Sequence, residues 1–234
     1  AVRKPTSKFG GRLEPFMHTD LSFSRGRTTL HTITQAATLH AYTGPIMADY
    51  AAYTCASTIA ELAEDLTQNS AGTTELYTLT HGAFATLAHA QHTPQRVLTR
   101  YLARAMDRSG WPLIGERCTR CGTPLTPEAT AREGTAEAPG RYLAFHTAHT
   151  YGQYTVLCPK CAPATDAPLT ALTAEDLAYA LAAASPNPSA WETIDAAPRG
   201  TADKILKLYL ATTQNLLERP LKTLGALEAE TPAK

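Results

Sequence analysis

Two cysteine pairs place the strongest constraint on how this chain can fold. Cys118 and Cys121 form one Cys-x-x-Cys pair, and Cys158 and Cys161 form the second. Each pair presents two thiolates from one tight turn, and two such turns complete the tetrahedral sulfur shell that zinc prefers. The spacing therefore predicts one structural Zn²⁺ held by all four cysteines. The fifth cysteine, Cys55, stands among apolar residues and is expected to pack in the core.

The segment between the pairs is long for a compact zinc ribbon. Residues 122–141 are rich in Pro, Thr, Glu and Gly, which indicates an insertion. Doubling the length of a loop raises its free energy of closure by only about 0.6 kcal/mol. Binding of a structural zinc contributes on the order of 10 kcal/mol, so the insertion is compatible with the site. His146 and His149 lie near the second pair, but their spacing on an expected strand turns them to opposite faces. We do not expect them to bind the metal.

The composition indicates a globular chain that can bury a core. Hydrophobic residues make up 44% of the 234 positions and charged residues 18%, unlike a disordered chain. No stretch approaches the roughly 18 consecutive apolar residues of a membrane span, and no signal peptide is recognisable. We therefore expect a cytoplasmic protein whose cysteines bind metal rather than form disulfides.

The zero net charge hides a segregation of charge along the chain. Residues 1–30 carry a net charge of +4, residues 31–95 carry −5 without any Lys or Arg, and residues 96–120 return to +4. Local fields rather than the average charge attract a polyanion, so both basic segments are candidates for such contact.

The first basic segment contains four cations, two glycines and an aromatic residue within ten positions. Cations contact phosphates, glycine lets the backbone approach, and an aromatic ring stacks on a base. The candidate nucleic-acid contacts are Arg3, Lys4, Lys8 and Arg12. The alternative is a solvated N-terminus without a partner.

The second basic segment is a predicted helix over residues 95–107. Four arginines recur every four residues, forming one stripe: Arg96, Arg100, Arg104 and Arg108. Like charges at this spacing destabilise a helix, which favours either an anionic partner or an intramolecular one. The intramolecular candidates are Glu61, Glu64 and Asp65.

Periodicity predicts an α+β fold with mostly helical content. Strands are expected within residues 1–43 and 142–156, and helices over about 45–68, 74–90, 94–108, 173–184 and 201–218, the last two separated by a Pro-rich stretch, 185–200. We expect an N-terminal domain (1–43), a helical domain (44–112 with 167–234) and a zinc-ribbon module (113–166) containing the insertion.

Three further segments carry a family resemblance. Residues 3–16 are similar to a basic strand and loop, residues 48–62 to an opening helix, and residues 208–224 to a closing helix that ends in an Arg-x-Leu-Lys-Ser/Thr motif, here Arg219, Leu221, Lys222 and Thr223. Together with the cysteine pairs, this order resembles the RecO family of recombination mediators.

The resemblance implies an N-terminal OB-fold, a helical domain and a zinc ribbon. Because the chain starts inside the basic strand, the OB barrel is expected to lack strands. The family implies a non-catalytic, nucleoid-associated protein that binds single- and double-stranded DNA and anneals complementary strands. It further implies contact with the C-terminal tail of single-strand binding protein (SSB), cooperation with RecR and, indirectly, loading of RecA. Lys222 and the arginine stripe are candidate contacts for the tail or for DNA.

Two other function classes stay open on the sequence. A zinc-dependent nuclease or hydrolase would need an open coordination position and nearby carboxylates, and four thiolates argue against it. No phosphate-binding Gly-rich loop, Gly-x-Ser-x-Gly or His-Glu-x-x-His motif occurs, so we predict no enzyme and no catalytic residue. A zinc-ribbon protein–protein adaptor that does not bind DNA is the other alternative.

Overall fold

A computed structural model of the chain describes residues 9–26, 30–68, 73–125, 142–145, 155–158, 160–161, 169–223 and 225. Several expectations concern residues outside these ranges: Arg3, Lys4, Lys8, His146, His149 and most of the insertion (126–141).

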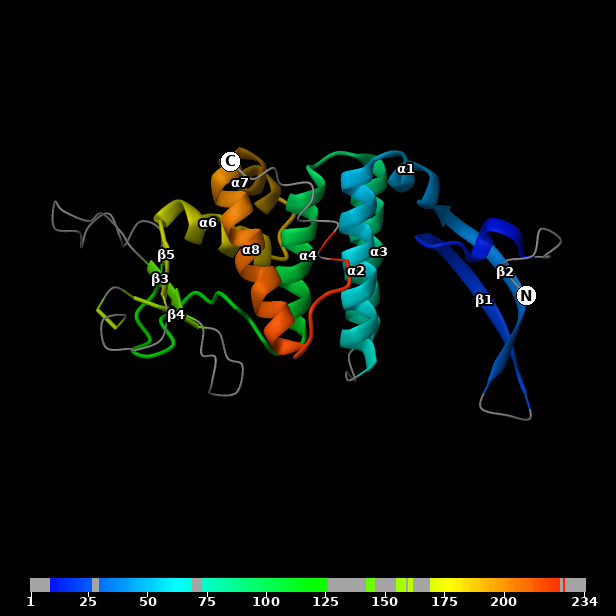
Figure 1. Cartoon of the computed structure of the whole chain (residues 1–234), viewed down its shortest axis with the longest axis horizontal. Coiled ribbons are helices and arrows are strands. Elements are labelled where there is room, and N and C mark those ends of the chain that lie inside the picture. The colour runs from blue at the N-terminus through cyan, green and yellow to red at the C-terminus, as the bar shows by residue number, and fades with distance from the viewer. Residues whose placement is uncertain are drawn as a thin grey trace.

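The described residues form helices and two small sheets. In chain order the elements are η1 (Gly10–Leu13), β1 (Met17–Arg25), β2 (His31–Ala41), α1 (Thr43–Ala48), α2 (Tyr50–Gln68), α3 (Thr73–His89), α4 (Pro94–Arg108), β3 (Tyr142–Phe145), β4 (Thr155–Leu157), β5 (Leu169–Leu172), α6 (Ala174–Ala184), α7 (Ala190–Ala196) and α8 (Arg199–Leu216). The β1–β2 hairpin lies at one end, the β4-β3-β5 sheet at the other, and the helices between them (Figure 1). The predicted α+β class is confirmed.

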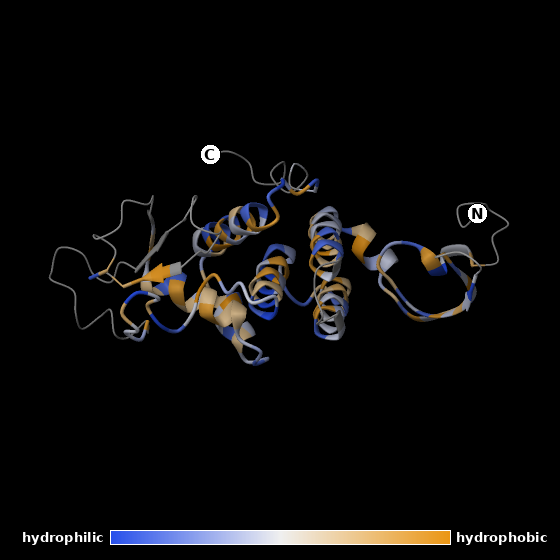
Figure 2. Cartoon of the chain, turned by 90° about the horizontal axis from the view of Figure 1, so that it is seen from below, coloured by the Kyte–Doolittle hydropathy of each residue, from blue (hydrophilic) through white to orange (hydrophobic). Residues whose placement is uncertain are grey.

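An aromatic residue at the base of the hairpin packs against the helices. β1 and β2 pair antiparallel with two bulges, and an isolated two-stranded hairpin is marginally stable in water. Phe16, which precedes β1, is buried with its ring edge-on to Tyr53 at 6.1 Å and Phe84 at 5.3 Å. The hairpin therefore depends on α2 and α3 for its position. Figure 2, a perpendicular view, shows it extending away from these helices.

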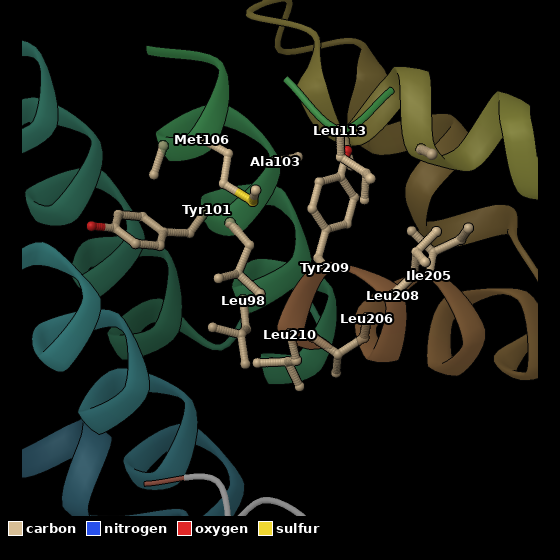
Figure 3. Close-up of a cluster of buried hydrophobic side chains, with 14 of the residues drawn as sticks. Leu98, Tyr101, Ala103, Met106, Leu113, Ile205, Leu206, Leu208, Tyr209 and Leu210 are labelled. Carbon is tan, nitrogen blue, oxygen red and sulfur yellow. The ribbon is translucent and has the colours of Figure 1, made fainter. Parts of the chain in front are cut away.

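α4 is the centre of the helical body. It packs against α2 and α3 on one side and against α6 and α8 on the other. Figure 3 shows the contact with α8, where Leu98 and Met106 meet Tyr209 and Leu210. Leu98 and Leu102 are fully buried, and truncating such a leucine to Ala typically costs 2–5 kcal/mol. None of the described helices has the length and hydrophobicity that a bilayer crossing requires.

Two expectations about local structure were wrong, and one strand was not predicted. The helix expected over residues 45–68 is two helices, α1 and α2, because the backbone of Asp49 is extended. Asp49 Oδ1 accepts hydrogen bonds from Ala51 N at 2.8 Å and Ala52 N at 3.2 Å, and so caps α2. The Pro-rich stretch 185–200 contains α7, whose Ile194 is fully buried. β5 pairs with β3 and was not expected.

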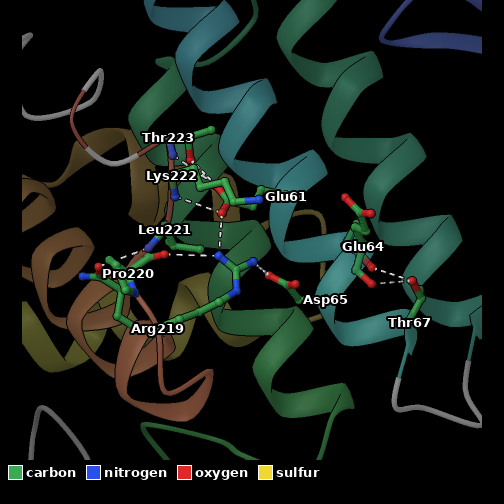
Figure 4. A network of polar contacts seen from close by, with 11 residues as sticks. Glu61, Glu64, Asp65, Thr67, Arg219, Pro220, Leu221, Lys222 and Thr223 are labelled. Carbon is green, nitrogen blue, oxygen red and sulfur yellow. Dashed lines mark hydrogen bonds and ion pairs between the residues drawn. The ribbon is translucent and has the colours of Figure 1, made fainter.

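A polar clamp joins the C-terminal segment to α2 (Figure 4). Glu61 accepts hydrogen bonds from Arg219 Nη1 at 2.9 Å, Lys222 N at 2.9 Å and Thr223 N at 3.1 Å. Arg219 also pairs with Asp65. Burial by itself would raise the pKa of Glu61, but these hydrogen bonds lower it from 4.5 to about 2. The Arg-x-Leu-Lys-Thr motif thus docks the chain after α8 onto α2.

The low pKa of Glu61 makes the clamp dependent on pH. Its contribution to stability is complete above pH 4.5 and is lost as the pH falls through about 2. We expect Glu61→Gln to lower the free energy of unfolding by about 1–3 kcal/mol at pH 7, and by progressively less towards pH 2. Denaturant unfolding followed at several pH values measures this. Glu64→Gln is the control, because Glu64 is an exposed carboxylate on the same helix. If Glu61→Gln lowers the free energy of unfolding equally at pH 7 and at pH 2, the assignment is contradicted.

Candidate metal centre and arginine helix

The first cysteine knuckle is formed by backbone hydrogen bonds after α4. Cys118 N donates to Thr123 O and Gly122 N donates to Cys118 O, both at 2.8 Å. Gly122 has a φ of +73°, in the left-handed region that glycine adopts without strain. The second knuckle follows β4 directly, with Cys161 N donating to Cys158 O at 3.0 Å. Each Cys-x-x-Cys pair is therefore a tight turn, as its spacing predicts.

The four thiols converge on one point. The sulfur atoms of Cys118, Cys121, Cys158 and Cys161 all lie within 4.8 Å of one another, and Cys121 Sγ is 3.7 Å from Cys158 Sγ. A tetrahedral zinc with Zn–S bonds of about 2.3 Å separates its sulfurs by about 3.8 Å. This cluster can hold a metal ion, and its donors are compatible with zinc.

The electrostatics of the cluster favour binding of a cation. Burial would raise the pKa of the Cys118 thiol, but backbone N–H groups, led by that of Cys158, lower it. Hydrogen bonds with Thr123 lower the pKa of Cys121 to about 6. The second pair has the opposite shift: burial raises the pKa of Cys158, and the neighbouring Cys121 raises that of Cys161 to about 12. A divalent ion would offset the repulsion among four thiolates and stabilise all of them in the deprotonated form.

The surroundings of the cluster are apolar on one side. Cys118 and Cys158 are buried and belong to the same apolar cluster as Leu125, Val156 and Leu157. A closed shell of four sulfurs leaves no position for water or substrate. The arrangement suits a structural ion that holds the two knuckles together.

Arg12 is the one candidate DNA contact of the N-terminal segment within the described ranges. It lies on η1 with an exposed side chain, and its Nη1 donates to Ala36 O at 3.3 Å. This single bond leaves most of the donors of the guanidinium available for phosphate oxygens.

Two arginines of the stripe bind backbone carbonyl groups. Arg96 donates to Ile194 O at 2.5 Å and to Ala197 O at 2.6 Å. Arg100, 6% exposed, donates to Ala182 O at 2.9 Å and to Asn187 O at 3.0 Å. The two carbonyls bound by Arg96 lie at the C-terminal end of α7, where helical partners are absent. The two bound by Arg100 lie at and just after the end of α6 and also accept backbone hydrogen bonds, from Ser185 N and Ala190 N. Both arginines therefore attach α4 to the α6–α7 region.

Burial of Arg100 has an electrostatic cost that its neighbours offset. Desolvation, followed by the charge of Arg104, lowers the pKa of Arg100 to about 10, so it stays charged at neutral pH. Its guanidinium also lies 5.1 Å from the ring of Trp191, a favourable cation–π distance.

The other two arginines of the stripe are more accessible. Arg108 pairs with Glu75 of α3 at 2.7 Å. Arg104 is half-buried, and its pKa is lowered by desolvation and by the nearby charge of Arg108. No hydrogen bond or ion pair joins its side chain to another residue in the described ranges. It lines a hollow of about 250 Å³ together with apolar residues of α3, α4 and α7, among them Leu79 and Trp191.

The acidic residues expected to neutralise the stripe have another partner. Glu61 and Asp65 bind Arg219, and the ion pair of the stripe with α3 is made by Glu75. The intramolecular alternative, pairing of the stripe with Glu61, Glu64 and Asp65, was therefore wrong for Glu61 and Asp65, although Arg96 and Arg100 do have intramolecular partners. The side chain of Lys222 is exposed, while its backbone N binds Glu61.

A comparison with protein families identifies the chain. A family model described as the C-terminal part of recombination protein O matches residues 47–225. The chain belongs to the RecO family. The match includes all four clustered cysteines, the arginine helix and the clamp, and RecO proteins act in DNA repair and recombination. The hairpin and the basic N-terminal segment precede the matched range.

Sequence reasoning missed some residues that shape this RecO site. Trp191 and Asn187 contact Arg100 from a stretch expected to be a spacer, because α7 is too short for a helical period to stand out. Glu75 was counted only as part of the acidic segment. The spacing of Arg108 and Glu75 along the chain carries no signal, since their helices meet only after folding.

We expect one tightly held zinc per chain, bound by the four clustered cysteines. Cys118→Ser should lose the metal and unfold the ribbon, while the helical circular dichroism signal is largely kept because the helices have their own core. Metal analysis of protein purified without chelator measures the first effect. Cys55→Ala is the control, since Cys55 is buried on α2 and distant in sequence from the cluster. Absence of zinc from the wild-type protein would contradict the assignment.

Proposed function

We propose that this RecO-family chain is a recombination mediator rather than an enzyme. In this proposal it binds single- and double-stranded DNA, anneals complementary strands and, with RecR, helps to load RecA onto strands coated by SSB. It would act at the nucleoid, in the cytoplasm. The observation that carries the proposal is the family match over residues 47–225. The closed four-sulfur cluster supports a structural zinc and gives no open position for hydrolysis.

DNA contact is proposed for the basic N-terminal segment. Arg3, Lys4, Lys8 and Arg12 contribute to a net charge of +4 over residues 1–30. The exposed guanidinium of Arg12 supports this, because phosphate contact needs donors that solvent can reach. The acidic stretch 31–95 would repel a polyanion from α2 and α3, so we expect DNA on the hairpin side.

Contact with the acidic C-terminal tail of SSB is proposed for the hollow beside Arg104. A half-buried cation without an intramolecular acceptor in the described ranges suits a carboxylate. The apolar lining, including Leu79, Val97 and Trp191, suits the hydrophobic end of such a tail. Arg96 and Arg100 are assigned a positioning role here, since their donors are used by backbone carbonyls.

DNA binding should depend strongly on salt and weakly on sequence. If the four N-terminal cations each meet one phosphate of a single strand, log K against log salt should have a slope of about −3. Titration of a fluorescent oligonucleotide at several salt concentrations measures this, and replacing all four cations by Ala should bring the slope near zero. Lys207→Ala, an exposed cation on α8, is the control. If the wild-type chain does not bind DNA at low salt, the adaptor alternative is supported. If it binds DNA but does not anneal complementary strands, the mediator role is contradicted.

Replacing Arg104 should separate binding of the tail from stability. We expect Arg104→Ala to weaken binding of an SSB tail peptide by about 1–3 kcal/mol with little change in melting temperature. Arg100→Ala should instead lower the melting temperature, because two buried charge-assisted hydrogen bonds, to Ala182 O and Asn187 O, are lost. Calorimetric titration and thermal unfolding of both variants measure these effects. Unchanged peptide affinity in Arg104→Ala would reject the hollow as the tail site.

A further inference from the structure

Three histidines meet where the hairpin joins the helical body. His18 of β1 and His40 of β2 are cross-strand neighbours, and His81 projects from α3. The His18 and His40 rings are stacked at 5.3 Å, and the His81 ring lies 4.2 Å from that of His18. One ring nitrogen of each histidine lies within 4.8 Å of the other two. Histidines so distant in sequence come together only through the packing of the hairpin on α3.

The arrangement is close to that of a three-histidine metal site. His18 Nδ1 is 3.0 Å from His40 Nδ1, and two imidazoles on a tetrahedral ion with metal–nitrogen bonds of about 2.0–2.1 Å have nitrogens about 3.3–3.4 Å apart. The nitrogen of His81 lies within 4.8 Å of both. His40 is exposed and the other two rings are half-buried, so an ion can enter and a water can take the fourth position.

Two tyrosines orient the rings from outside. Tyr77 Oη lies 2.6 Å from His18 Nε2, which directs Nδ1 of the same ring towards His40. Tyr42, which is buried, has its hydroxyl 3.1 Å from His81 Nε2. Metal-binding histidines characteristically have such a partner on the second nitrogen, which fixes the tautomer and the ring plane.

We propose that His18, His40 and His81 bind a first-row divalent metal ion of the zinc class, at a site separate from the cysteine cluster. Three neutral imidazoles and a water form a borderline-soft donor set that suits Zn²⁺, Co²⁺ and Cu²⁺ and disfavours Mg²⁺ and Ca²⁺. The ion links two strands of the hairpin to α3. It therefore sets the direction of the hairpin relative to the helices, a role independent of whether the hairpin binds DNA.

The test is metal uptake by the full chain without a polyhistidine tag and with its cysteines loaded with zinc. Equilibrium dialysis against Co²⁺ should add one equivalent, with d–d absorption bands and no additional thiolate-to-metal charge transfer. Cu²⁺ bound in the same way should show nitrogen hyperfine coupling in its electron paramagnetic resonance spectrum. Added metal should also raise the melting temperature, because it binds only where hairpin and helix are packed together.

Variants assign the site to its residues. His40→Ala, at an exposed position, should lose the added equivalent or weaken its binding at least tenfold while keeping the cysteine-bound zinc. His89→Ala, an exposed histidine of α3 outside the cluster, should keep both metals. Saturation of the wild-type protein at the cysteine-bound zinc alone would overturn the proposal and leave the three rings as a stacked, hydrogen-bonded cluster. Full uptake by His40→Ala would overturn it as well.

Discussion

The burial of α4 between two groups of helices is the interaction on which the other parts of the structure depend. Its apolar residues contact α2 and α3 on one side and α6 and α8 on the other. Because every other long helix contacts it, α4 is the main link between the N-terminal hairpin with its supporting helices and the half of the chain that carries the cysteine cluster. The clamp between Arg219 and α2 is a second link between these halves. The two arginines that bind the ends of α6 and α7 add directional hydrogen bonds to this nondirectional packing. They hold α4 in a defined orientation, which burial of apolar area does not do.

The arginines of α4 divide between structure and exposed charge according to what surrounds each one. Arg96 binds carbonyl oxygens at the C-terminal end of α7, where helical partners are absent. Arg100 adds a charged donor to two carbonyl oxygens, at and just after the end of α6, that also accept backbone hydrogen bonds. Arg104 and Arg108 lie one and two turns further along α4 than Arg100, where Arg104 lines the hollow and Arg108 pairs with Glu75. A single sequence pattern with a four-residue repeat therefore includes residues with different roles.

The small sheets at the two ends of the molecule are stabilised in different ways. A small sheet cannot bury enough apolar area to be stable by itself. At one end the β4-β3-β5 sheet lies next to four convergent thiols, whose donor set is compatible with zinc. At the other end the hairpin rests on aromatic packing around Phe16 and on the histidine and tyrosine contacts with α3. Neither sheet has a core of its own: residues of β4 and β5 are buried in the main core, and specific side-chain contacts at each end hold the sheets in place.

The sequence determined the features that depend on local spacing. The knuckles follow from Cys-x-x-Cys, and α3, α4, α6 and α8 from apolar periodicity, because these signals involve residues a few positions apart. The repeated motif also predicted that the two cysteine pairs converge, but tertiary structure decided the other pairings of distant residues. The pairing of Glu61 with Arg219 rather than with α4, and the meeting of His18, His40 and His81, join positions between 22 and 158 residues apart. No local pattern encodes such contacts, because the partner of a charged or aromatic side chain is chosen by how whole helices and strands pack.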